Sequence, residues 1–317
     1  MTEPRLRALV LTAGLGTRLR PLTYLRAKAA VPINGEPLVG RAIRSLVDGG
    51  IRDLVLNLHH HPATIAAVVG DGSGYGARVR YSWEQPVLGS AGGPRHALPL
   101  LTTDEDDDFL IVNGDTLTNV DIDALVSRHR SSGALVTMAL IENPRPDHYG
   151  GVVVTADGWI TGFGRAGRYH FIGLQVAKAR VFASLQDGVP AESVNMLYPQ
   201  LITANPRAIA AHISDASFLD IGTPRDCLET SLALAEKESP RLIGARAKIH
   251  PSAGVLRSAL WDDVTVGAGA RLENCIVGDG TLIPEGAVFE RCAIIPADSH
   301  SVAPGERIEG TLLVREL

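Results

Sequence analysis

Cationic residues follow a glycine-rich turn close to the start of the sequence. The stretch "LTAGLGTRLRPLTYLRAKAAVP", which begins at residue 11, places Arg18, Arg20 and Lys28 after the glycines Gly14 and Gly16. A strand that ends in such a turn exposes several backbone N–H groups at the carboxyl end of a sheet, where ligands of open α/β folds bind. Such groups hold anions without a charged side chain. The turn and the cations together indicate a site for a phosphorylated ligand.

Two common glycine motifs do not describe this turn. A dinucleotide-binding G-x-G-x-x-G motif needs a third glycine where the chain has Leu19, and a Walker A loop needs Gly-Lys followed by Ser or Thr. A purely structural turn would leave Arg18, Arg20 and Lys28 unexplained. The sequence therefore indicates a phosphate-binding turn of another kind.

The composition limits the partners that the chain can have. Its 317 residues are enough for two domains, and they are 45% hydrophobic and 21% charged, as in globular proteins. With a net charge of −5 the chain lacks the basic field that nucleic acids attract. No apolar run approaches the roughly 18 residues of a membrane span, and the N-terminal run is too short for a signal peptide. Because the three cysteines show no CxxC spacing, we expect a cytoplasmic protein with reduced thiols. From the net charge and the short apolar runs, we expect it to bind neither nucleic acid nor membrane.

Short apolar runs alternate with helical patterns over the first 240 residues. Strands are predicted at 6–11, 53–58, 79–83 and 109–112, and helices at 38–47, 63–69, 93–101 and 122–130. This alternation predicts a mainly parallel mixed sheet with helices on both faces. Strands spaced by glycines are expected from 135 to 176, and helices return at 194–204 and 224–237. The acidic run 104–108 is expected to be a solvated loop.

The sequence changes character after residue 240. Beyond the linker "ESPRLIG", apolar residues recur every six positions, with small residues and aspartate between them. The longest series in phase is Val264, Ala270, Ile276, Leu282, Val288 and Ile294. A period of six predicts a hexapeptide β-helix, in which each of these side chains points into a narrow prism. We therefore expect an α/β domain over 1–240 and a short left-handed β-helix over 241–317.

The motifs of the first domain resemble those of the sugar-1-phosphate nucleotidyltransferases, which join an NTP to a sugar 1-phosphate and release pyrophosphate. The resemblance covers about residues 6 to 237 and begins with "AGLGTRLRPLT" and the lysine that follows it. It continues through "LGSAGGPRHAL", "LIVNGDTL", "HYGGVVV" and "FLDIGTPRDCLETS". Many members also carry a hexapeptide tail. The resemblance implies a Rossmann-like, mainly parallel mixed sheet, the nucleotidyltransferase fold, followed by the β-helix.

The chemistry of that reaction accounts for the cations. A phosphate monoester is about half to fully dianionic at neutral pH, so the site must mainly position two polyanions and neutralise developing charge. The resemblance implies that the Gly14–Thr17 backbone cradles the triphosphate and that Arg18 neutralises the leaving pyrophosphate. It places Lys28 near the α-phosphate. It also implies that Asp115 and Asp220 hold Mg²⁺, a hard cation suited to carboxylates and phosphates.

The remaining binding residues are also carried over from the resemblance. Glu84 or Gln85 is expected to hydrogen-bond the edge of the base, and the sugar is expected beside Gly151 and Gly173, although both glycines could be ordinary strand bulges. Gly89 and Gly92 are expected to let the backbone approach the base. The residues predicted to bind the nucleotide are Ala13, Gly14, Gly16, Thr17, Glu84, Gln85, Gly89, Gly92, Asn113 and Gly114. Those predicted to bind the sugar are Gly151, Arg165, His170 and Gly173.

Two stretches depart from the family's motifs. "AKA" stands where many members have "PKP" around the lysine, and "GRAG" stands where they often have a Glu-Lys-Pro motif whose lysine contacts the sugar phosphate. Arg165 or Arg168 could replace that lysine with a planar fork. His170 stands where an asparagine commonly contacts the sugar. These departures leave the sugar open and allow for an inactive relative.

The function that these features favour is nucleotidyl transfer from an NTP to a sugar 1-phosphate, of the kind catalysed by mannose-1-phosphate guanylyltransferases. The alternatives are a uridylyl- or thymidylyltransferase acting on another sugar 1-phosphate, and a regulatory subunit that binds an NDP-sugar without catalysis. A β-helix that also transfers an acyl group would need a catalytic pair, whereas His250 and His300 lie near its edges. We expect the tail to form a homo-oligomer instead.

Overall fold

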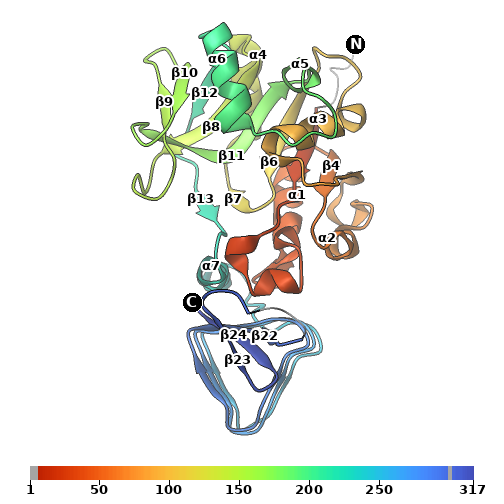
Figure 1. The fold of residues 1–317 in the computed structure, drawn as a ribbon, viewed down its shortest axis with the longest axis vertical. Coiled ribbons are helices and arrows are strands. Elements are labelled where there is room, and N and C mark those ends of the chain that lie inside the picture. The colour runs from red at the N-terminus through yellow and green to blue at the C-terminus, as the bar shows by residue number, and fades with distance from the viewer. Residues whose placement is uncertain (1–5, 299–301) are drawn as a thin grey trace. The chain divides into compact units, whose positions relative to one another are not determined.

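A computed structural model describes residues 6–298 and 302–317 (Figure 1). The chain forms two compact units, one made of residues up to 14 together with 39–219, and the other of 15–38 together with 220–317. The second unit therefore contains the tail and also the N-terminal stretch with Arg18, Arg20 and Lys28. The boundary at residue 240 stays a prediction from composition, and His300 lies outside the described residues.

The first unit is built on a mainly parallel mixed sheet, as predicted. β1 (Arg7–Leu11) pairs in parallel with β4 (Asp53–Leu58) on one side and with β6 (Asp108–Asn113) on the other. β4 pairs in parallel with β5 (Arg78–Trp83), and the long strand β11 (Tyr169–Lys178) lies antiparallel to β6. β1, β4, β6 and β11 form strands because their central apolar side chains are buried almost completely.

The other half of this sheet is rich in short strands, as the spacing of the glycines predicted. β8 (Val136–Glu142) lies antiparallel to β11 and parallel to β12 (Ile209–Ile213). β9 (Val152–Val154) and β10 (Ile160–Phe163) pair with each other, and β9 also pairs with β11. A separate pair is formed by β7 (Thr116–Thr118) and β13 (Phe218–Asp220).

Helices connect the strands of this unit, and all but the four-residue α5 lie at the predicted places. They are α1 (Leu38–Asp48), α2 (Pro62–Val69), α3 (Gly89–Leu101), α4 (Ile122–Ser132), α5 (Arg180–Ala183) and α6 (Tyr198–Ala204), the last preceded by a π-helical turn (Ser193–Leu197). The N-terminus of α4 is capped by Asp121, whose carboxylate accepts a hydrogen bond of 2.9 Å from the Ala124 amide. No helix in the described part of the chain is long and apolar enough to cross a membrane.

The second unit combines one long helix with a β-helix. The helix, α7 (Pro224–Lys237), begins with a capping box between Thr223 and Asp226. Short parallel strands then stack in three columns. The columns are β14 (Lys248–Ile249), β17 (Thr265–Val266) and β20 (Leu282–Ile283); β15 (Gly254–Leu256), β18 (Arg271–Glu273) and β21 (Val288–Glu290); and β16 (Ala259–Leu260), β19 (Ile276–Val277) and β22 (Cys292–Pro296). The chain ends with the antiparallel strands β23 (Glu306–Glu309) and β24 (Leu312–Glu316).

The β-helix corrects one part of the repeat prediction. Leu282 and Val288 were expected to point into the prism, but they are 62% and 68% exposed. One coil is 17 residues long, as the contact between Ser258 and Cys275 shows, so it is one residue short of three sixes. A strict six-residue spacing therefore falls out of phase after one coil, and Ile283 and Phe289 take the buried positions.

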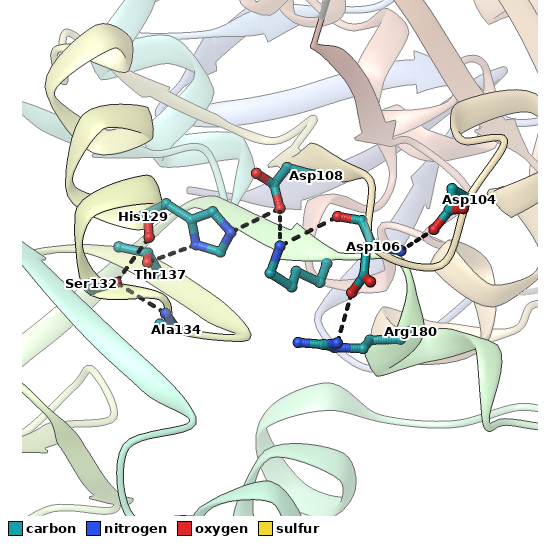
Figure 2. A network of polar contacts seen from close by, with 9 residues as sticks. Asp104, Asp106, Asp108, His129, Ser132, Ala134, Thr137 and Arg180 are labelled. Atoms are coloured by element: carbon teal, nitrogen blue, oxygen red, sulfur yellow. Dashed lines mark hydrogen bonds and ion pairs between the residues drawn. The ribbon is translucent and has the colours of Figure 1, made fainter. Parts of the chain in front are cut away.

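The start of β6 carries a partly buried polar network (Figure 2). The His129 ring of α4 is hydrogen-bonded through Nδ1 to Thr137 Oγ1 at 2.9 Å and through Nε2 to Asp108 Oδ1 at 3.2 Å. The same carboxylate oxygen accepts a hydrogen bond of 3.1 Å from Lys178 Nζ. The acidic run is thus not a solvated loop throughout, because its last residue, Asp108, begins a strand and its side chain is only 21% exposed.

Asp108→Asn is expected to destabilise the folded protein near neutral pH by about 1–3 kcal/mol, the range for a lost charge-assisted hydrogen bond. Burial alone would raise the pKa of Asp108, but the contacts with His129 and Lys178 outweigh it and lower the pKa. The unfolded chain therefore takes up the proton first as the pH falls, and the contribution to stability is lost through the folded-state pKa.

Urea unfolding of both proteins between pH 3 and pH 8 measures this difference. The gap between wild type and Asp108→Asn should be full at neutral pH and close at the acid end. Asp106→Asn is the matched control, because Asp106 pairs with Arg180 at 2.6 Å but its side chain is 69% exposed. A gap that is independent of pH, or equal in the control, would contradict the assignment.

Candidate active-site loop and strand ends

Gly16 is the residue that shapes the turn after β1. Its φ of +61° lies in the left-handed region, and a Cβ built on it would lie 2.8 Å from Thr23 Cγ2 and 3.1 Å from Lys28 Cβ. The Thr23 hydroxyl donates a hydrogen bond of 2.9 Å to the Gly16 carbonyl oxygen. A glycine is therefore required here, and the turn lies against the stem of Lys28.

The residues after the turn form three single-turn 3₁₀ helices. They are Thr17–Leu19, Leu22–Tyr24 and Lys28–Ala30. Leu19 and Leu22 are fully buried and anchor the segment, whereas Arg18 is exposed. A Cβ on Gly222 would lie 3.1 Å from Arg18 Nη1 and 3.3 Å from Asp220 Oδ2. In the second unit, the side chains of Arg18 and Asp220 therefore both lie next to Gly222.

The first unit brings together another set of predicted residues at the carboxyl ends of β1 and β6. The Gly114 amide donates a hydrogen bond of 3.0 Å to the Leu11 carbonyl oxygen, which ties the loop of Asn113–Asp115 to the end of β1. Ala13 is buried in the same region, and Gly14 is exposed. The expected arrangement of adjacent strand ends is therefore present.

Gly151 and Gly173 have packing reasons for their identity. Gly173 has a φ of +83° and sits where the pairing of β11 with β8 shifts register, and a Cβ on it would lie 2.9 Å from Asn113 Cβ. A Cβ on Gly151 would lie 2.3 Å from the Gly167 carbonyl oxygen, since the 164–167 turn crosses over it. The close approach of the Asn113 side chain at Gly173 and of the Gly167 backbone at Gly151 accounts for both glycines, and their contact with a sugar stays a prediction.

The two candidate arginines differ in their surroundings. Arg168 forms an ion pair of 3.1 Å with Glu142 on the surface, while Arg165 is exposed in the 164–167 turn. His170 is hydrogen-bonded through Nδ1 to the Gly150 carbonyl oxygen at 3.2 Å.

An aromatic cluster that the sequence analysis missed surrounds His170. The ring of Tyr149 lies 4.5 Å and that of Phe218 lies 4.9 Å from the His170 ring, between centroids. The guanidinium of Arg145 lies 4.9 Å from the Tyr149 centroid and donates to its hydroxyl oxygen at 2.7 Å. Tyr149 and Phe218 stand inside two of the motifs already quoted, so the signal was present in the sequence.

A buried chain of hydrogen bonds joins the ends of three strands on the predicted nucleotide side. The Asn57 side chain accepts from the Thr12 amide at 2.6 Å and donates to Glu84 Oε1 at 2.7 Å. The other oxygen, Oε2, accepts from the Leu88 amide at 2.8 Å. Glu84 is 1% exposed, so it holds this loop in place, while its neighbour Gln85 is exposed.

Gly89 and Gly92 also face the protein itself. A Cβ on Gly89, whose φ is +77°, would lie 2.6 Å from Glu192 Oε1, and one on Gly92 would lie 2.7 Å from the Val189 carbonyl oxygen. The Ala191 carbonyl oxygen accepts from the amide of Ala91 at 2.9 Å, in the first turn of α3. The glycines admit this segment, and their contact with a base stays a prediction.

Residues 7–237 match the family model described as "Nucleotidyl transferase". The chain belongs to the nucleotidyltransferase family. The resemblance drawn from its motifs is therefore confirmed.

Among curated relatives, a mannose-1-phosphate guanylyltransferase of Mycobacterium tuberculosis is 29% identical over 313 residues, which cover 92% of this chain and 85% of that one. An N-acetylmuramate alpha-1-phosphate uridylyltransferase of Neisseria meningitidis is 32% identical over 223 residues, covering 69% of this chain and 94% of that one.

Solved structures show the same fold. HddC from Yersinia pseudotuberculosis, complexed with GMP-PN, superimposes with a TM-score of 0.61 at 20% identity, over 72% of this chain and 99% of that one.

Glu84→Ala should destabilise the protein by about 2–3 kcal/mol, because it leaves the buried Asn57 amide and the Leu88 N–H without acceptors. Gln85→Ala is the matched control one residue along, and should leave the free energy of unfolding nearly unchanged. Urea unfolding measures both. Equal stability of the two variants would contradict the scaffold role of Glu84.

Proposed function

We propose that the chain transfers a nucleotidyl group from an NTP to a sugar 1-phosphate, with guanylyl transfer to mannose 1-phosphate as the first candidate. The observation that carries the proposal is the loop in which Gly16 lies against Lys28 while Arg18 lies beside Asp220. The guanylyl preference is supported by the M. tuberculosis relative, whose similarity extends over 92% of this chain.

The residues of the loop have distinct roles in this proposal. An oxygen of the sugar phosphate forms a bond to the α-phosphorus of the NTP, the bond to the β-phosphate oxygen breaks, and pyrophosphate leaves. The backbone from Ala13 to Thr17 holds the triphosphate, Arg18 compensates the charge that grows on the leaving pyrophosphate, and Lys28 holds the α-phosphate region. Because the attacking oxygen is already ionised, these residues act by position and charge.

Two carboxylates are suited to a divalent cation. Asp115 and Asp220 offer hard oxygen ligands, and among residues 6–298 and 302–317 no group of three or more His, Cys, Asp or Glu could hold a metal. A pair of carboxylates fits Mg²⁺, which proteins commonly bind through one or two carboxylates while phosphates and water complete the shell. When bound, the cation would neutralise phosphate charge.

Base and sugar recognition follow from what remains accessible. We assign the edge of the base to Gln85, because both oxygens of Glu84 already accept hydrogen bonds. Arg165 is the better candidate for the sugar phosphate, because Arg168 is paired with Glu142. His170, which lies on the same strand as Gly173, would contact the sugar.

Two alternatives keep specific support. A uridylyltransferase of Synechocystis and a thymidylyltransferase of Streptomyces griseus, both acting on glucose 1-phosphate, align with 97% and 98% of this chain. A regulatory subunit without catalysis would be consistent with "GRAG" in place of the usual lysine motif.

We further propose that the chain acts in the cytoplasm as a homo-oligomer assembled through the β-helix. Its Cys227, Cys275 and Cys292 are unpaired, as in reducing compartments, and Leu282 and Val288 expose apolar surface on the tail. Light scattering should show an oligomer that Leu282→Glu dissociates. A monomeric wild type would contradict this assembly.

Pyrophosphate release with Mg²⁺, measured over a grid of NTPs and sugar 1-phosphates, tests the reaction. One pair of substrates should be turned over, and Asp115→Asn and Lys28→Gln should each lower kcat by about 10²–10³. Asp106→Asn is the control, since the exposed Asp106 precedes β6 at the opposite end of that strand from Asp115, and it should stay within about threefold. A blank grid from folded protein that binds NDP-sugars would favour the regulatory subunit.

A further inference from the structure

The β-helix contacts the cation-bearing loop at two points. Both lie between Arg18 and Lys28, the two residues predicted to bind phosphate. The Arg20 carbonyl oxygen, two residues after Arg18, accepts a hydrogen bond of 2.8 Å from Arg315 Nη1 of β24. Arg26, two residues before Lys28, reaches the corner of the coils. The tail thus contacts the loop two residues from Arg18, at Arg20, and two residues from Lys28, at Arg26.

Arg26 makes the more extensive of these contacts. Its Nε and Nη2 donate to the two carboxylate oxygens of Asp279 at 2.5 and 2.6 Å, and Nη2 also donates to Asp262 Oδ2 at 2.7 Å. Its guanidinium lies 5.5 Å from the ring centroid of Trp261. The side chain of Arg26 is only 15% exposed, and those of Asp262 and Asp279 are 36% and 27% exposed, so the contact is partly shielded from water.

The two carboxylates need this arginine. Asp262 and Asp279 are 17 residues apart, one coil of the helix, and the Asp262 amide donates to Asp279 Oδ1 at 3.1 Å. Two carboxylates this close repel each other, and a guanidinium that bridges them converts the repulsion into attraction. The two carboxylates therefore hold the guanidinium of Arg26 in one position. An arginine on a flexible loop without such partners would not be held in this way.

Close packing accompanies the charges. A Cβ on Gly278 would lie 2.6 Å from Leu25 Cδ1, so the coil presents a glycine where the loop's leucine rests. This contact and the ion pairs constrain the residues directly before Lys28. Displacement of a phosphate-binding group by about 1 Å can cost 10²-fold in rate.

We propose that Arg26, held by Asp262 and Asp279 of the β-helix, is a positioning residue for Lys28, so that the tail takes part in the reaction through the loop it supports. Arg26 itself does not touch the substrate. The inference rests on the proposed nucleotidyl transfer, in which Lys28 acts on the NTP.

The tail offers a matched ion pair that does not contact the loop. Arg246 donates to Asp263 at 2.6 and 2.7 Å, again across 17 residues. It is likewise an arginine–aspartate pair, but both partners lie in the β-helix and their side chains are 68% and 51% exposed, against 15% for Arg26. Asp263→Asn therefore controls for the loss of an aspartate charge in the tail, and the thermal midpoint of each variant reports its own loss of stability.

The experiment compares kcat, KM and thermal midpoint for wild type, Asp279→Asn, Arg26→Gln and the control Asp263→Asn. Asp279→Asn should lower kcat about tenfold with a smaller change in KM and a thermal midpoint close to that of the control, which should keep the wild-type kcat. Arg26→Lys should recover part of the loss. The double variant Arg26→Gln/Asp279→Asn should be no slower than Arg26→Gln, because both act through one contact.

Calorimetric titration with Mg²⁺ and GTP, UTP or dTTP, whose α-phosphate Lys28 is assigned to hold, separates this inference from the reaction itself. If wild type turns over no substrate, a severalfold weaker binding by Asp279→Asn than by Asp263→Asn would still support the positioning role, and only the proposed function would fail. Equal kcat, or in an inactive protein equal binding, in Asp279→Asn and the control would overturn the inference.

Discussion

A guanidinium bound between two carboxylates on successive coils is the contact on which the cation-bearing loop depends. The loop between β1 and α1 has no long element of its own, since it consists of three-residue 3₁₀ helices and two-residue strands. Such short pieces make few internal hydrogen bonds and cannot fix a cation by themselves. The buried Leu19 and Leu22 anchor the loop, and the β-helix contacts it at the Arg20 carbonyl oxygen, through Arg315, and at the Arg26 side chain.

The strand ends of the first unit are held by a different device. Loops at the carboxyl edge of a parallel sheet contain many polar backbone groups, and each buried one needs a partner. Asn57 and Glu84 supply these partners for Thr12 and Leu88. Gly89 and Gly92 in the same loops leave room for the neighbouring residues 189–192, so both glycines have a packing reason for their identity.

Local patterns predicted the elements well, and long-range contacts explain where they failed. The strands of the parallel sheet follow from apolar runs whose burial needs no knowledge of partners, and α7 has the bounds, 224–237, that its helical pattern predicted. Asp108 looked solvated because its partner Lys178 lies 70 residues away, and the partners of Arg26 lie 236 and 253 residues away. Leu282 is exposed because one coil is 17 residues long. A six-residue apolar period therefore does not stay in phase with the buried positions from one coil to the next.

Amide hydrogen exchange of the full-length chain tests the central claim most directly, because it reports the order of the loop without any assumption about substrates. Peptides that cover residues 16–28 should exchange several times faster in Asp279→Asn than in wild type, while peptides of β6 and the same peptides in Asp263→Asn should not change. Equal exchange of the loop in all three proteins would show that the β-helix does not hold it in place.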